Sequence, residues 1–445
     1  MHPASLLRFT LASLALLGAQ LWIETARAED KPYISVGQAK TKKTVMAFPQ
    51  IQAGGDAKDV GAQIHDVVSR DLAFMDLFRF LDPKGYLEKS GGLVPGTFKF
   101  SDWTAVGAEF VLKTGLAKAG NTVTLEAYLY DAFGAKQVLG KRYVASVNDA
   151  RTVAHTLAGD VVNALTGFPG IFLTKIAMSC EKAKKKEIYI MDFDGTNVRQ
   201  ITRHGSIAFS PAWSPDGTKL AYSLYTKRRD NIKNIDLYEY DFTSNSVQML
   251  SNRKGINSGA SYSPRSDLIA LTMSFLGNPE IFTFNRATSQ VTRLTNSFGF
   301  DVDPSWSPDG SKLAFVSSRS GMPMVFSMNA DGSNPQRLTY AGRYNATPSW
   351  SPRGNKIAFA GWLDGRFDIF IMNPDGSNIE RLTKNQGNNE DPSFSPDGNF
   401  IVFSSNRTGG QNVYVMNVDG SFTKRLTFGM GNCVAPKWSA PPPRK

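Results

Sequence analysis

Histidine and cysteine are scarce in this chain, which has four histidines and two cysteines among 445 residues. The histidines, His2, His65, His155 and His204, are scattered, and neither a His-Glu-x-x-His nor a Cys-x-x-Cys spacing occurs. Zinc sites usually draw their ligands from closely spaced residues of these types. We therefore expect neither a metal nor another cofactor.

Motifs of catalysis are also lacking. The Gly-x-Ser-x-Gly turn of hydrolases does not occur, and we expect no hydrolase domain after the C-terminal region. Residues Asp192 to Asn197 are similar to a calcium loop, but Arg203 stands where that loop needs a bidentate glutamate, so a hairpin turn is the better interpretation. The sequence predicts a protein that is not an enzyme.

Long hydrophobic runs are missing as well. The longest, Phe9 to Leu17, follows Arg8 and precedes the small-x-small sequence Ala26-Arg27-Ala28. This arrangement is typical of a secretory signal, and the run falls short of the ~20 residues that span a membrane, although a retained anchor is the alternative. We predict a signal peptide over residues 1–28 and a periplasmic mature protein.

The excess of positive charge is modest. The formal charge of the whole chain is +11. Such an excess fits an acidic partner or envelope surface, or only a solvated exterior. We expect no nucleic-acid partner, which an exported protein would rarely meet.

What the chain does contain is a repeated phrase. Its aromatic residues lie 49, 44, 44, 44 and 44 positions apart, and each is followed by Ser-Pro or Ser-Ala. A fixed period of this length with β-branched and aromatic residues is typical of a β-propeller blade. The six aromatic residues are Trp213, Tyr262, Trp306, Trp350, Phe394 and Trp438.

The last repeat is truncated, and its missing strands are found before the first one. Residues 175–179, 188–191 and 198–202 match the second, third and fourth strands of a blade. Pairing of the strand around Trp438 with that around Ile176 would close a six-bladed ring without an open edge. The predicted fold is an α/β N-terminal domain followed by an all-β six-bladed β-propeller with split-blade closure.

The remaining boundaries follow from this ring. Residues 44–167 are predicted to form the α/β domain, with helices over residues 56–74 and 149–165, Asp149 as N-cap and Gly167 as stop. The propeller is expected over residues 168–440, and residues 441–445 form a tail. Phe168-Pro169-Gly170 would join the two domains.

Residues 29–43 precede the α/β domain and are polar and rich in lysine. Only Tyr33, Ile34, Ser35 and Val36 could form a strand there. This segment is either an untethered tail or a docking strand that pairs with the sheet edge of another protein.

The two cysteines fall in the split blade. Cys180 ends its second strand and Cys433 precedes its first strand, so the antiparallel pairing makes them neighbours. An oxidising compartment permits a disulfide between them, and two unpaired thiols are the alternative.

The combination of domains resembles the TolB family of the Tol-Pal system. The likeness covers nearly the whole mature chain and includes Ser101 to Glu109, similar to the Asp-Trp…Gly-Ala stretch of the family's first domain. The resemblance implies a monomeric scaffold that binds the lipoprotein Pal through the propeller and TolA through the N-terminal strand, Tyr33 to Val36. Through Pal it would be peripheral to the outer membrane and support that membrane's integrity and its invagination in cell division. A propeller lyase or a peptidase-associated propeller is the alternative.

A Pal site is predicted on the propeller face opposite the Ser-Pro-Asp-Gly turns, because its loops vary between repeats. Gly259, Val302, Asp303, Thr347 and Asp391 enter first strands there and should ring the channel mouth, and the resemblance implies Pal contacts at the first three; strand-end capping is the alternative for the acidic residues.

A basic rim is expected on the same side of the propeller, although these loops could equally be a solvated surface. Its residues are Lys182, Lys184, Lys185, Lys186, Lys227, Arg228, Arg229 and Lys233. The α/β domain should sit near the opposite face, since the linker enters the split blade there.

Overall fold

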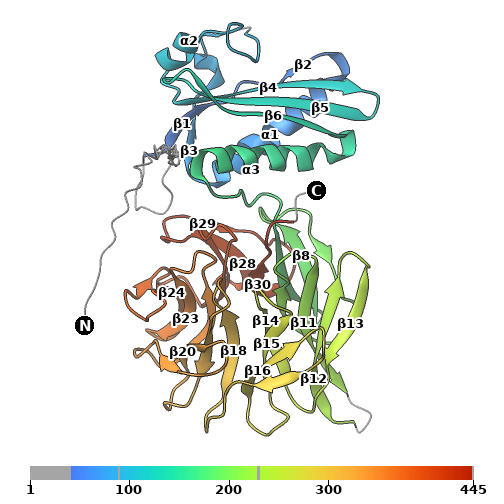
Figure 1. Cartoon of the computed structure of the whole chain (residues 1–445), viewed down its shortest axis with the longest axis vertical. Helices are drawn as coiled ribbons and strands as arrows, with labels where there is room; N and C mark the ends of the chain where they lie inside the picture. Colours follow the sequence, from blue (N-terminus) through green and yellow to red (C-terminus); the bar gives the residue numbers. More distant parts are fainter. Residues whose placement is uncertain (1–41, 89–90, 228–230, 443–445) are drawn as a thin grey trace, which may run out of the picture.

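The computed structural model describes residues 42–88, 91–227 and 231–442. The predicted signal peptide and the segment Tyr33 to Val36 lie outside the described residues. Two bodies stand one on the other in Figure 1, a smaller α/β domain and a β-propeller. The predicted fold class is confirmed.

The α/β domain is a mixed sheet with two long helices on one side (Figure 1). Its strands follow the order β3-β1-β4-β5-β6, and the short β2 (Gln52–Ala53) pairs with β4. The elements of this sheet are β1 (Thr44–Ala47), β3 (Phe78–Phe80), β4 (Phe110–Ala119), β5 (Thr122–Asp131) and β6 (Lys136–Ser146). The short helix α2 (Phe100–Ala105) precedes β4.

Helices α1 (Lys58–Phe74) and α3 (Ala150–Thr166) pack against each other, because both carry apolar residues at helical spacing. Gly167 ends α3 in the left-handed region at φ 76°, where glycine has no Cβ penalty. Asp149 is the N-cap residue of α3, as predicted, but its side chain makes no capping hydrogen bond. It closes a 3-10 turn with ψ of 7°, and its carboxylate accepts a hydrogen bond from Ser146 Oγ at 2.7 Å instead.

Six four-stranded antiparallel sheets form the propeller. Blade one contains β10 (Ala208–Trp213), β11 (Lys219–Lys227), β12 (Lys233–Asp241) and β13 (Ser246–Ser251), and blade two contains β14 (Asn257–Tyr262), β15 (Leu268–Met273), β16 (Glu280–Asn285) and β17 (Val291–Arg293). Blade three contains β18 (Asp301–Trp306), β19 (Lys312–Ser317), β20 (Met324–Asn329) and β21 (Gln336–Arg337), and blade four contains β22 (Asn345–Trp350), β23 (Ile357–Leu363), β24 (Arg366–Met372) and β25 (Glu380–Arg381). Blade five contains β26 (Asn389–Phe394), β27 (Phe400–Thr408), β28 (Gly410–Asn417) and β29 (Thr423–Arg425).

Blade six is assembled from both ends of the propeller sequence. Its order is β30 (Asn432–Trp438), β7 (Lys175–Lys182), β8 (Lys185–Asp192) and β9 (Arg199–Gln200). Cys433 stands opposite Cys180 in this sheet, with Cα atoms 4.0 Å apart, and a disulfide joins the two. The bond therefore ties the closing strand to the start of the ring.

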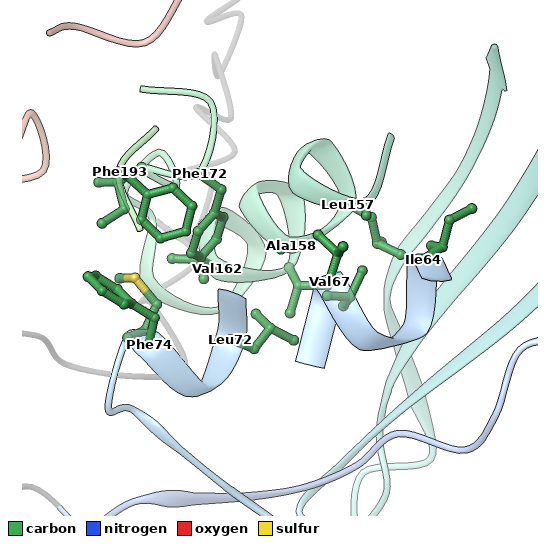
Figure 2. Close-up of a cluster of buried hydrophobic side chains, with 14 of the residues drawn as sticks. Ile64, Val67, Leu72, Phe74, Leu157, Ala158, Val162, Phe172 and Phe193 are labelled. Atoms are coloured by element: carbon green, nitrogen blue, oxygen red, sulfur yellow. The ribbon is translucent and has the colours of Figure 1, made fainter. Parts of the chain in front are cut away.

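One face of the propeller is covered by the α/β domain. Phe74, at the end of α1, places its ring 5.1 Å from that of Phe193 and 5.3 Å from that of Phe400, both on the propeller (Figure 2 shows Phe74 and Phe193). Phe193 and Phe400 lie beside tight turns of their blades. We call this the covered face, and the one with the loops between the second and third strands and between blades the open face.

Polar contacts reinforce the same interface. Arg151 of α3 donates a hydrogen bond from Nη2 to Asp194 Oδ2 at 3.1 Å, and the Arg353 guanidinium lies 4.2 Å from the ring centre of Phe168 in the linker. The placement expected for the α/β domain is the one observed.

Candidate partner-binding face

The first strand of every blade carries the same irregularity. Pairing with the second strand slips by one residue within each, which is a β-bulge. The residue at each bulge has a positive φ: Ser210 48°, Gly259 63°, Asp303 55°, Thr347 47°, Asp391 56° and Ala435 52°. Only glycine adopts this region freely, and other residues there cost about 1–3 kcal/mol each.

These six first strands form a closed inner ring. Each contacts the next, from β10 to β14, β18, β22, β26, β30 and back to β10. The structure brings together four of the residues predicted for the Pal site, Gly259, Asp303, Thr347 and Asp391, at equivalent bulge positions. Val302 immediately precedes one bulge. Strain of the same kind is thus repeated around the ring, and such strain persists only where the surrounding structure over-determines the backbone.

The two predicted aspartates have different surroundings. Asp391 is structural, because its Oδ2 atom accepts hydrogen bonds from Ser404 Oγ at 2.9 Å and from the Ala435 amide at 3.1 Å. The Asp303 carboxylate makes no hydrogen bond within the described residues, and its Oδ1 atom would lie 3.3 Å from a Cβ placed on Gly259. Of these two aspartates, Asp303 is therefore the one whose carboxylate is free to meet a ligand.

Charges inside the ring act on one another. Burial raises the pKa of Asp303 to about 6, helped by Asp391 and opposed by Lys437. Burial also raises the pKa of Glu390 to about 7, again with help from Asp391. Burial lowers the pKa of Lys437, against the attraction of Asp391 and Asp303. Burial and neighbouring charges thus shift the pKa values of Asp303, Glu390 and Lys437 in the inner ring.

Sequence reasoning missed Lys437 and Glu390, although the repeats carried a signal for the first. Lys437 stands just before the blade's aromatic residue, where the other five repeats have a small residue, namely Ala212, Ser261, Ser305, Ser349 and Ser393. A lone lysine at a position otherwise kept small indicates a special role.

Exposed aromatic residues on the open face were also missed. Phe298, Tyr340 and Phe428 lie on loops that lead into first strands, and their exposed fractions are 109%, 72% and 69%. Large exposed aromatic side chains are frequent anchors of protein interfaces.

The predicted basic rim falls on hairpins of two neighbouring blades. The described residues with exposed side chains are Lys182, Lys184, Lys185, Lys227 and Lys233. Lys186 is only half-buried, and Arg228 and Arg229 lie outside the described residues.

Two negative findings concern only the described part of the chain. No cluster of three or more His, Cys, Asp or Glu is arranged there to hold a metal ion. None of its helices is long and apolar enough to cross a membrane.

The fold therefore defines a six-bladed propeller with an α/β domain seated on one face and a strained, charged ring facing the other. The family model of the TolB amino-terminal domain matches residues 32–138, and that of the TolB beta propeller domain matches residues 162–362 and 345–442. The chain belongs to the TolB family.

Individual relatives agree with this assignment. The Tol-Pal system protein TolB of Desulfosudis oleivorans is 36% identical over 274 residues, 60% of this chain and 61% of the relative. That of Anaeromyxobacter dehalogenans strain 2CP-1 is 35% identical over 264 residues, 59% of each chain. The chain thus aligns with about three fifths of the length of these relatives.

A solved structure extends the likeness to both domains. The crystal structure of TolB from Acinetobacter baumannii superposes with a TM-score of 0.77 at 25% identity, covering 90% of this chain and 97% of the other. Membership in this family agrees with the expectation of a protein that is not an enzyme.

Proposed function

We propose that this protein is a periplasmic scaffold of the Tol-Pal system. It binds Pal through the open face of the propeller and TolA through residues 29–43, and so supports outer-membrane integrity and invagination during cell division. The relatives named above carry the Tol-Pal name, and the disulfide between Cys180 and Cys433 suits an oxidising compartment.

The single observation that carries Pal binding is the contrast between the faces. The covered face is occupied by the α/β domain through Phe74, Phe193 and Phe400. The open face retains exposed aromatic side chains and an inner ring in which the Asp303 carboxylate accepts no hydrogen bond from the described residues. Of the two faces of the propeller, only the open face can therefore receive a large partner without displacing a domain.

Asp303→Lys tests the proposal. This change reverses a charge inside the ring, and we expect it to weaken Pal binding by more than about 1.4 kcal/mol, tenfold in affinity. Binding is measured by calorimetry with Pal of the same organism, and thermal melting checks the fold.

The matched control is Asp309→Lys in a covered-face turn. The Asp309 carboxylate accepts hydrogen bonds from Ser307 Oγ at 2.5 Å and from the Ser311 amide at 3.1 Å, so this variant should lose some stability but not Pal affinity. Equal effects of the two changes on Pal affinity would refute the placement.

Deletion of residues 29–43 tests the TolA part. We expect the shortened protein to lose TolA binding and to bind Pal as well as before or more tightly, because the two sites are separate. Loss of both partners in a folded deletion variant would contradict separate sites.

A further inference from the structure

In blade three, an arginine of the blade itself occupies a site near the open face. Arg319 follows β19 and lays its guanidinium 5.4 Å from the ring centre of Phe315 and 5.3 Å from that of Phe326. Its Nε atom donates to Ser317 Oγ at 2.8 Å, and its Nη2 atom donates to Asp301 Oδ2 at 2.8 Å. An aromatic pair, a hydroxyl and a side-chain oxygen thus form a complete guanidinium site.

Blade five repeats this site 88 positions later in the sequence. The Arg407 guanidinium lies 5.1 Å from the ring centre of Phe403 and 4.8 Å from that of Tyr414. Its Nε atom donates to Ser405 Oγ at 3.0 Å, and its Nη2 atom donates to Asn389 Oδ1 at 2.7 Å. An asparagine oxygen therefore serves as well as a carboxylate.

Blade four, between them, has the site without the arginine. Phe359 and Phe370 are stacked with ring centres 5.4 Å apart, and Asn345 stands at the position of the acceptor. The arginine is replaced by Leu363, which is 39% exposed, and the serine by Gly361. A cavity of about 50 Å³ remains, lined by all five of these residues.

The cavity suits a guanidinium group in size and offers it one hydrogen-bond acceptor, the Oδ1 atom of Asn345. One water needs roughly 10–15 Å³ on this measure, so there is room for about four such groups, the number of heavy atoms in guanidinium. Asn345 uses its Nδ2 group to donate to the Ala341 carbonyl at 2.9 Å, while its Oδ1 atom accepts no hydrogen bond within the described residues and points toward Gly361, 2.9 Å from a Cβ placed there.

One arginine of this blade, Arg381, already places its guanidinium 6.0 Å from the ring centre of Phe370, which lines the cavity. Arg381 is already held by Asp364 and by the buried Asp368, with Nη–Oδ distances of 2.7 and 2.5 Å. Blades three and five likewise hold a second arginine, Arg337 and Arg425, on the fourth strand beside the one in the site.

We propose that the blade-four cavity receives the arginine side chain of a protein that docks on the open face. The cavity lies between the loop that leads into β22 and the end of β23, both on that face. The choice of Pal as the donor of the arginine rests on the proposed function, whereas the affinity of the cavity for arginine does not.

The first arm of the test uses N-acetyl-arginine methylamide as probe. Titration should shift the NMR signal of the Trp362 indole, which lines the cavity, and saturate, and N-acetyl-lysine methylamide should bind at least fivefold more weakly, because only the planar guanidinium stacks on the rings. Absence of a saturable shift, or equal binding of the two probes, would overturn the proposal.

The second arm fills the cavity from within. Leu363→Arg should restore the arrangement of the neighbouring blades, raise the melting temperature, abolish probe binding and weaken Pal binding at least threefold. Asp309→Lys on the covered face is the control, and it should leave both probe binding and Pal affinity unchanged. If Leu363→Arg blocks the probe but leaves Pal affinity unchanged, an arginine of Pal is not the occupant and the docking proposal fails.

The proposed function and the proposed arginine site can be refuted independently of each other. Loss of the Pal interaction in the unmodified protein would refute the proposed function, and the arginine probe would still decide the cavity. Should Leu363→Arg not fold, the preference of the unmodified protein for arginine over lysine decides it.

Discussion

The two faces of the propeller use the same residue type in opposite ways. On the covered face, Phe74 is buried among Phe193 and Phe400, so its ring joins the two domains. On the open face, Phe298 is fully exposed on a loop. The covered face, built from uniform tight turns, thus packs against the other domain. The open face, built from irregular loops, leaves apolar side chains exposed to a partner.

The largest effect is expected from Phe74→Ala. Removing a buried phenylalanine costs about 3–5 kcal/mol, and here the loss falls on the contact between the domains. We expect the free energy of unfolding, measured with urea, to fall by this amount, with Pal affinity retained in the folded state. The matched change Phe298→Ala should leave stability within about 0.5 kcal/mol and weaken Pal binding, as truncation of an exposed interface anchor does. An exchange of these two outcomes would break the comparison of the faces.

The disulfide gives the next largest effect. Replacement of both Cys180 and Cys433 by alanine removes a link between residues 253 positions apart. We expect a loss of about 2–4 kcal/mol, measured by thermal melting without reductant. Added reductant should lower the melting temperature of the unmodified protein to that of the variant, and it should leave the melting temperature of the variant unchanged. A variant as stable as the oxidised protein would show that the hydrogen bonds of β30 alone close the ring.

A smaller effect, of opposite sign, is expected from Asp303→Asn. Because the pKa of Asp303 is raised to about 6 in the folded protein, its ionised form destabilises the fold at high pH, and protonation relieves this cost. The variant should be about 1–3 kcal/mol more stable at pH 8, and this gain should shrink as the pH falls through 6 and vanish below 4. Asparagine tolerates the φ of 55° at this position.

Asp309→Asn is the control, because the pKa of Asp309 is shifted in the opposite direction to that of Asp303. Hydrogen bonds from Ser307 and Ser311 lower the pKa of Asp309 to about 2, so its ionised form stabilises the turn above pH 4. This variant should lose stability at neutral pH, and the loss should disappear as the pH falls toward 2. Parallel pH profiles for the two asparagine variants would contradict the contrast between ring and turn.

The repeat period made the propeller predictable, since Trp306, Trp350 and their equivalents recur where each first strand ends. Split-blade closure followed from the missing strands, because residues 175–202 match a blade without its first strand and the last repeat supplies that strand. The bulges could not be predicted, since their positive φ is held by tertiary contacts and occurs at Ser210, Asp303 and Ala435 alike.

The candidate site was only partly visible in the sequence. Asp303 and Asp391 look equivalent in the repeat, but the Asp391 carboxylate accepts two hydrogen bonds, whereas that of Asp303 accepts none from the described residues. The cavity of blade four could not be predicted either, because it arises where Leu363 replaces an arginine. Only the structure of the neighbouring blades shows that an arginine fills the same space there.

The most direct test of the two-face account is hydrogen–deuterium exchange of the protein with and without saturating Pal. The account predicts slower exchange on binding in residues 296–303 and 340–347 of the open face, and unchanged exchange in the covered-face turns at residues 192–197 and 395–398. Protection confined to the covered-face turns, with the open-face segments unchanged, would contradict it.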